Sequence, residues 1–110
     1  MAKSLLIDWL TKQGMHVSGT KTPYEMMQFY RTYAIKDISH LVKQDVLVMC
    51  GAEDHYVPVH EFSDQIATLT NVRSLAARLF TRAEQGQNHV QMGNLGLALR
   101  VMLDWIGSLT

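Results

Sequence analysis

The chain has 110 residues, of which 47% are hydrophobic and 18% are charged, proportions typical of one globular domain with a single core. Ten basic and ten acidic residues cancel, which argues against nucleic-acid or anionic-membrane partners because these require a basic surface. The sequence shows neither a signal peptide nor a hydrophobic run of about 18 residues that would span a membrane. Since Cys50 is the only cysteine, we expect a cytoplasmic protein without an internal disulfide.

The first 44 residues predict two helices. Residues 4–13 carry a broad apolar face, and Gly14 is the expected stop. Threonine, proline and glutamate within residues 22–25 supply an N-cap, a first helical residue and a capping-box partner for a second helix that extends to about residue 34. Its apolar face is either a ligand-pocket wall or, as we expect, part of the core. The residues of this face are Met26, Met27, Phe29, Tyr30 and Tyr33.

Residues 45–58 predict a buried strand followed by an acidic loop. Residues 46–50 are all apolar, without polar alternation, as expected for a parallel strand that is covered on both faces. Gly51 ends the strand, and Asp54 follows three residues later. Functional groups of open parallel α/β sheets gather on the loops at the carboxyl ends of the strands. Asp54 is therefore a candidate for chemistry.

The second half of the chain predicts a helix, a strand and a final helix. Pro58 opens a helix that we expect to stop near Asn71, and residues 73–81 form a strand with two mostly apolar faces. The two strands and the helix between them make a right-handed βαβ unit with parallel strands. Asn94 is the expected N-cap of a last helix that ends at Gly107. One face of this helix is predicted to contain Leu95, Ala98, Val101, Met102, Trp105 and Ile106.

Residues 82–93 form a polar, glycine-containing loop that carries His89. Because neighbouring parallel strands end at the same edge of a sheet, the topology can bring His89 to Asp54 across 35 positions of sequence. A carboxylate that accepts a hydrogen bond from one imidazole nitrogen leaves the other nitrogen available as a general base. The alternative is that both residues are solvated loop residues.

Two segments resemble α/β-hydrolases. Residues 46–58, Val-Leu-Val-Met-Cys-Gly-Ala-Glu-Asp-His-Tyr-Val-Pro, resemble the late strand and acid loop of this superfamily, with Asp54 at the position of the acid. Residues 78–96 resemble its final strand and histidine loop, with His89 at the position of the histidine. The similarity is greatest to the branch with dihydropseudooxynicotine hydrolase-like and dipeptidyl-aminopeptidase or acylaminoacyl-peptidase-like proteins.

The resemblance implies an α/β chain with a partial α/β-hydrolase fold, two parallel strands and about four helices. Residues 45–110 would be the C-terminal βαβα part of the domain, and residues 1–44 resemble the end of the lid and the approach to the sheet. The implied reaction is hydrolysis of an ester, an amide or a carbon–carbon bond in a small-molecule or peptide substrate. In it, His89 would activate a serine and Asp54 would orient the imidazole.

The nucleophile of the superfamily is missing from this sequence. It belongs to a G-x-S-x-G elbow upstream of the acid, and no such elbow occurs. Ser18 precedes a glycine but follows no strand, and Cys50 lies on the strand that leads to the acid. The oxyanion-hole donors of the elbow are missing as well. The sequence therefore predicts the C-terminal fragment of a serine-type hydrolase, inactive by itself; the alternative is a non-catalytic assembly or folding module.

The remaining expectations concern partners and metals. A two-stranded sheet has two open edges, so we expect either a homo-oligomer or binding to the remainder of a hydrolase domain. We expect Glu53 and Glu84 to be solvated charges. The alternatives are that Glu53 is a second carboxylate in acid–base chemistry and that Glu84 orders the histidine loop. A zinc site is the alternative chemistry, but the spacing C-x4-H-x4-H matches no common ligand pattern, so we expect neither a metal nor another cofactor. The donors of such a site would come from Cys50, Asp54, His55, His60 and His89.

Overall fold

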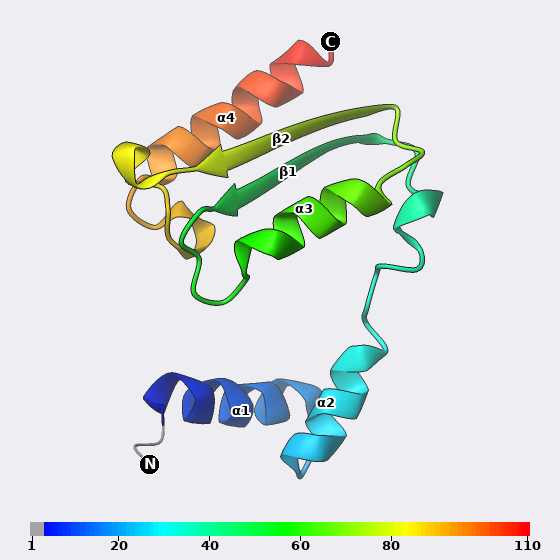
Figure 1. The fold of residues 1–110 in the computed structure, drawn as a ribbon, viewed down its shortest axis with the longest axis vertical. Helices are drawn as coiled ribbons and strands as arrows, with labels where there is room; N and C mark the ends of the chain where they lie inside the picture. The colour runs from blue at the N-terminus through cyan, green and yellow to red at the C-terminus, as the bar shows by residue number, and fades with distance from the viewer. Residues whose placement is uncertain (1–3) are drawn as a thin grey trace. The chain divides into compact units, whose positions relative to one another are not determined.

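The computed structural model describes residues 4–110, and the chain divides into two compact units between Ile35 and Lys36. The first unit contains α1 (Leu5–Ser18) and α2 (Pro23–Arg31). The second contains β1 (Asp45–Gly51), α3 (Val59–Thr68), β2 (Ser74–Phe80) and α4 (Leu95–Ser108) (Figure 1). Short 3-10 turns lie at Ser39–Leu41, Arg82–Glu84 and His89–Gln91.

Helix α1 continues past Gly14, which was the expected stop. It ends instead at Gly19, whose left-handed φ of 69° lets its N–H bond to the last carbonyls of the helix. Gly14 has a different purpose, because it allows α2 to approach closely. The Tyr30 hydroxyl donates to the Gly14 carbonyl at 3.1 Å, and a Cβ at Gly14 would lie 2.5 Å from the Met26 sulfur.

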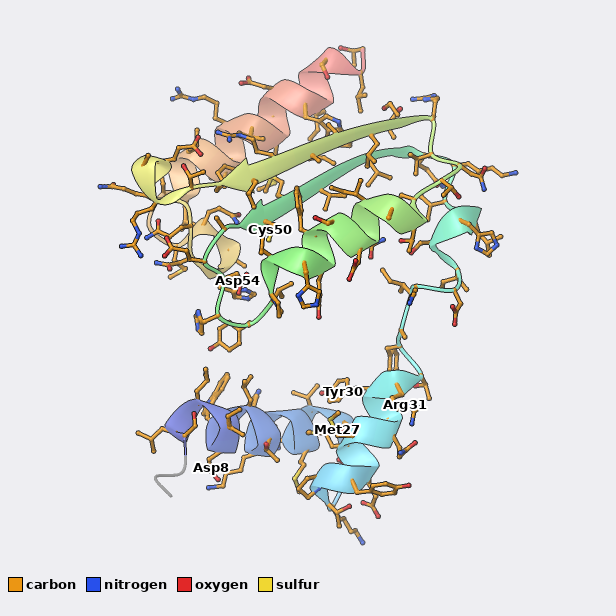
Figure 2. All side chains as sticks on the ribbon, viewed as in Figure 1. Asp8, Met27, Tyr30, Arg31, Cys50 and Asp54 are labelled. Atoms are coloured by element: carbon orange, nitrogen blue, oxygen red, sulfur yellow. The ribbon has the colours of Figure 1, made fainter. Side chains whose placement is uncertain are left out.

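Helix α2 begins as the sequence predicts. The Thr22 hydroxyl accepts the Glu25 N–H at 3.1 Å, and the Glu25 carboxylate accepts the N–H of Lys21 at 2.9 Å. The helix ends at Arg31, before the expected boundary. The core expectation for its apolar face is wrong, since no residue of α1 or α2 is buried. Met27, for example, is 58% exposed (Figure 2).

The second unit has the predicted topology. Strands β1 and β2 are parallel neighbours that pair over their full lengths, from Asp45 opposite Ser74 to Gly51 opposite Phe80. Helix α3 is the crossover connection between them, and α4 follows β2 (Figure 1). The predicted α/β class is confirmed, since residues 4–110 contain two parallel strands and, across both units, four α-helices.

Helices α3 and α4 begin where the sequence predicts, but neither ends at its predicted residue; α4 ends at Ser108, one residue past Gly107. Pro58 is the N-cap of α3, but the helix ends before Asn71, whose side chain instead donates to the His40 carbonyl at 2.7 Å. Asn94 caps α4 as predicted, because its side-chain oxygen accepts the Leu97 N–H at 3.2 Å. No helix within residues 4–110 is long and apolar enough to cross a membrane.

The core of the second unit is small. Phe80 is fully buried and Ala98 of α4 is 3% exposed, but Leu95 and Ile106 of the same helix are 50% and 53% exposed. The apolar face predicted for α4 is therefore wider than the face that is buried. Strands lie about 4.8 Å apart and a helix is about 10 Å wide, so a pair of strands is no wider than one helix and leaves the flank of α4 uncovered.

Candidate active site

Asp54 is positioned by its own loop. Its N–H donates to the Gly51 carbonyl at 3.2 Å, where β1 ends. One carboxylate oxygen, Oδ1, accepts the N–H groups of Tyr56 at 2.8 Å and Val57 at 3.0 Å. This side-chain turn fixes the carboxylate before Pro58 opens α3. The second oxygen, Oδ2, remains available to a partner from elsewhere in the chain.

The loop that carries His89 is anchored at its base by Glu84. The Glu84 carboxylate forms an ion pair with Arg78 of β2 and accepts the N–H and hydroxyl of Thr81 at 3.2 Å. The Asn94 side chain donates to the Glu84 carbonyl at 2.9 Å, which joins the loop to the start of α4. The expectation that Glu84 is a solvated charge is therefore wrong. The ion pair lowers the pKa of its carboxyl, with the Thr81 hydrogen bonds adding to the effect.

Direct contacts join the acid loop to the histidine loop. The Glu53 N–H donates to the Gln87 carbonyl at 2.9 Å, and the Glu53 carboxylate pairs with Arg82. Glu53 remains exposed, as expected, and the Arg82 guanidinium lowers the pKa of its carboxyl. At Gly51 the two loops touch, because a Cβ there would lie 2.4 Å from the Gln87 carbonyl oxygen. From the sequence alone, this glycine predicts only the end of a strand.

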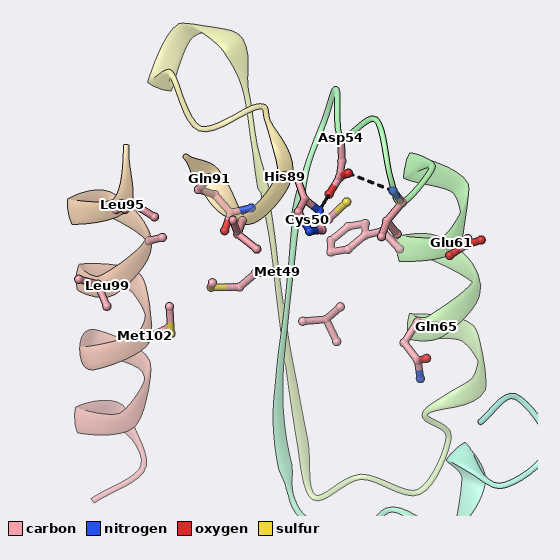
Figure 3. Close-up of a pocket in the computed structure, with 15 residues that line it drawn as sticks. Met49, Cys50, Asp54, Glu61, Gln65, His89, Gln91, Leu95, Leu99 and Met102 are labelled. Carbon is pink, nitrogen blue, oxygen red and sulfur yellow. Dashed lines mark hydrogen bonds and ion pairs between the residues drawn. The ribbon is translucent and has the colours of Figure 1, made fainter. Parts of the chain in front are cut away.

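These loops bring Asp54 and His89 together, as the topology predicted. The His89 Nδ1 lies 2.8 Å from Asp54 Oδ2 (Figure 3). An ionised carboxylate only accepts hydrogen bonds, so Nδ1 carries the proton and the Nε2 of a neutral imidazole keeps its lone pair. The next residue, Val90, has a left-handed φ of 50°, a conformation that is costly for a β-branched side chain.

The environment of Asp54 favours its charged form. Its side chain is 7% exposed, and this burial raises the pKa of the carboxyl. Hydrogen bonds from the Val57 N–H, the His89 ring and the Tyr56 N–H together outweigh burial, so the pKa lies below its usual value. Asp54 is therefore ionised at neutral pH, as required for an acid that orients a histidine.

Tyr56 contributes a second constraint on the imidazole. Its ring lies edge-on to the His89 ring, with 4.7 Å between the centroids, and also contacts the His55 ring at 4.0 Å. Aromatic contacts of this geometry are favourable and stabilise the observed position of the imidazole. Sequence reasoning missed this role, since an aromatic residue two positions after an acid carries no signal of its own.

The pair faces an open, mostly apolar cavity of about 690 Å³. Its walls are β1, α3 and α4, and Figure 3 shows Met49 directed to the α4 side of the strand and Cys50 lying on the α3 side. His89, whose side chain is 38% exposed, lies at the end of the cavity where β1 meets the acid loop. A cavity of this size and polarity can hold a small organic group.

No nucleophile accompanies the pair in the described residues. The residues that line the cavity include neither serine nor threonine. Cys50 lines it, but burial and the nearby charge of Asp54 raise the pKa of its thiol, and Sγ donates to the Gly51 carbonyl at 3.3 Å. A protonated thiol in this state is a poor nucleophile.

Metal binding finds no support in the part of the chain that the structure describes. Across residues 4–110, no three or more side chains of histidine, cysteine, aspartate or glutamate are grouped so that they can hold an ion. The imidazoles of His55 and His89 do lie near each other, with ring centroids 6.4 Å apart. His89, however, already uses Nδ1 for Asp54.

Comparison of the chain with protein-family models, with curated proteins and with solved structures finds no match. The resemblance to α/β-hydrolases therefore stays a prediction from the sequence motifs. The site must be interpreted from its own geometry.

Proposed function

We propose that the chain is the C-terminal part of a serine-type α/β-hydrolase, which supplies the acid and the histidine of an active site. The observation that carries this proposal is the 2.8 Å contact between Asp54 Oδ2 and His89 Nδ1, with the second carboxylate oxygen held by two backbone N–H groups. In a complete architecture the pair would serve hydrolysis of an ester, an amide or a carbon–carbon bond.

Each residue of the pair has a definite task in this chemistry. His89 Nε2 accepts the proton of an attacking hydroxyl and returns it to the leaving group. Asp54 keeps the proton on Nδ1 and stabilises the imidazolium that forms during the reaction. The apolar walls beside His89 would exclude water from the reacting groups once the rest of the site covers the open cavity. The nucleophile and the oxyanion donors must come from another polypeptide segment.

The state of the His89 ring tests this proposal without requiring a nucleophile. Two-bond proton–nitrogen NMR spectra above the titration range of histidine should show His89 as the Nδ1–H tautomer. Substitution Asp54→Asn should reverse or mix the tautomers, because the amide NH2 group can donate to Nδ1. His60 of α3 is the internal reference and should not respond. A His89 ring already dominated by the Nε2–H form in the wild-type chain would contradict the proposed role.

Activity measurements test the second half of the proposal, that the chain alone is inactive. Loss of one oxyanion donor typically costs about 100- to 1,000-fold in rate, and loss of the nucleophile costs more. We expect hydrolysis of activated acyl esters at a rate close to that of the buffer, and no labelling by a fluorophosphonate. A His89→Ala variant is the control. Stoichiometric labelling of one serine, with turnover that His89→Ala abolishes, would show that the chain has its own nucleophile.

A non-catalytic assembly or folding module is the second candidate function. It is favoured by the absence of serine and threonine from the cavity wall and by the unpaired long edge of β1 in the described residues. A gene context that encodes a G-x-S-x-G strand–turn–helix segment immediately upstream would favour the hydrolase. Its absence would favour the module.

A further inference from the structure

One long edge of β1 has no backbone partner among the described residues. β1 pairs with β2 alone, and α3 and α4 flank the strand on opposite sides (Figure 3). In a parallel pair, alternate residues direct both N–H and C=O toward the neighbouring strand. The Ala52 N–H donates to the Phe80 carbonyl at 2.9 Å, so the even-numbered residues face β2. Leu47 and Met49 therefore direct their backbone groups outward.

The outward edge lacks the features that prevent an exposed strand from pairing with a strand of another molecule. Proteins usually protect an edge with charges, proline or a bulge, and residues 46–50 contain no charge and no proline. The pairing with β2 is regular over all seven residues, without a bulge. The one charged residue of the strand, Asp45, lies at its start and is ion-paired with Arg73.

Helix α4 carries an exposed apolar stripe whose first half lies beside this edge. Its members are spaced by four, four and three positions, which places them on one side of the helix, and they are 50–67% exposed. Two of them also line the cavity beside β1. The stripe consists of Leu95, Leu99, Leu103 and Ile106.

We propose that this edge binds a second copy of the chain, with β1 antiparallel to β1 across a two-fold axis, giving a four-stranded sheet. In the favoured register, the outward groups of Leu47 and Met49 are bonded to each other across the two copies, so that the apolar residues of the strand pair with apolar residues. This register places Val48 on the axis, so that Leu47 of each copy exchanges two hydrogen bonds with the partner's Met49. The neighbouring registers are less stable, because they place Met49 opposite the partner's Asp45 or Leu47 opposite the partner's Gly51. Neither of these is an apolar cross-strand pair.

A second copy fits this surface because the surface is self-complementary. The two-fold axis is perpendicular to the sheet, so each α4 lies antiparallel to the partner's α4, and the two leucine stripes meet. No like charges are brought together along residues 46–50, and β-branched Val48 meets its own copy, a favourable cross-strand pair. The second copy would take the edge that the remainder of a hydrolase domain would otherwise pair with, so the dimer is an assembly of this chain by itself and does not rest on the hydrolase proposal. The two His89 side chains would lie at opposite ends of the four-stranded sheet.

Sedimentation velocity of the full chain, from low to high micromolar concentration, tests the assembly. We expect a species of twice the 12.5 kDa monomer mass. Leu103→Lys should raise the dissociation constant of the dimer by at least about tenfold, because it places a charge in a stripe that the dimer buries. The matched control is Leu41→Lys: Leu41 is 64% exposed and Leu103 is 67% exposed, but Leu41 lies outside the stripe, so this variant should dimerise normally.

Hydrogen exchange identifies the edge itself. In the dimer, the Leu47 and Met49 amides should be protected in a concentration-dependent way, whereas the Val46 and Val48 amides are protected by β2 at every concentration. A monomer at high micromolar concentration would overturn the proposal. So would an oligomer that Leu103→Lys leaves intact, or one in which the Leu47 and Met49 amides exchange freely. Concentration-independent protection of these two amides would show that the chain covers its own edge.

Discussion

The helical unit before Ile35 and the α/β unit after it are stabilised by contacts of different range. In the first, no helical residue is buried, and the helices are defined by bonds between residues a few positions apart, such as Thr22 with Glu25. In the second, bonds connect residues 28 to 35 positions apart, ending with Asp54 and His89. Local chemistry is sufficient to begin and end a helix, whereas a catalytic pair requires a sheet that brings two distant loops together.

The largest expected loss of stability comes from a substitution at Gly51, where the acid loop and the histidine loop are in close contact. Gly51→Ala would place a Cβ 2.4 Å from the Gln87 carbonyl oxygen, and backbone must move to accommodate it. We expect the free energy of unfolding of the second unit to fall by about 2 to 3 kcal/mol, with loss of the Asp54–His89 hydrogen bond. Urea unfolding and the His89 tautomer measure these effects.

Gly107→Ala is the control for this substitution. It adds the same methyl group in α4 where nothing lies within 4 Å, so the free energy of unfolding should stay the same or rise by up to about 1 kcal/mol, because alanine favours the helix over glycine. Equal losses in both variants would show that the loops are not in close contact at Gly51.

A loss of stability of intermediate size is expected when the pH is lowered below about 4. Because the pKa of Asp54 is lowered in the folded chain by the Val57, His89 and Tyr56 hydrogen bonds, despite burial, its contribution to stability is complete above the unfolded pKa of about 3.9. The contribution is lost as the pH falls from there through the folded pKa. Asp54→Asn removes this component, so its stability should decline less steeply below about pH 4.

Unfolding by urea at a series of pH values measures that difference. Asp45, Glu53 and Glu84 also have lowered pKa values through their arginine partners, and they remain in the variant, so subtraction isolates Asp54. Parallel acid profiles for the two proteins would contradict the pKa assigned to Asp54.

The smallest effect is expected in the first unit. Thr22→Ala removes the N-cap of α2, which typically costs about 1 kcal/mol, and should increase amide exchange within α2 while leaving the His89 resonances unchanged. Thr22→Ser keeps the hydroxyl and should preserve protection. A change in the His89 ring signals in the Thr22→Ala variant would show that the two units are energetically coupled.

Much of the α/β unit could be predicted because its signals are local and redundant. The uninterrupted apolar run of residues 46–50 indicates a strand, Pro58 a helix start and Asn94 an N-cap, and each appears where it was expected. The helix ends were less accurate. Gly14 resembles a terminator, yet it lies inside α1 because α2 packs against it, and sequence alone cannot distinguish a glycine that ends a helix from one that admits a neighbour.

The sequence by itself determined the order of elements, the parallel pairing and the two residues that meet. Hydrophobic periodicity and the right-handedness of the crossover connection leave few alternatives. Only the tertiary structure decided how the pair is held, through the contact at Gly51, the Glu53–Arg82 ion pair and the ring of Tyr56. It also decided that the apolar face of α4 is only partly buried, because the width of a sheet relative to its helices is a property of the assembled layers and not of any one segment.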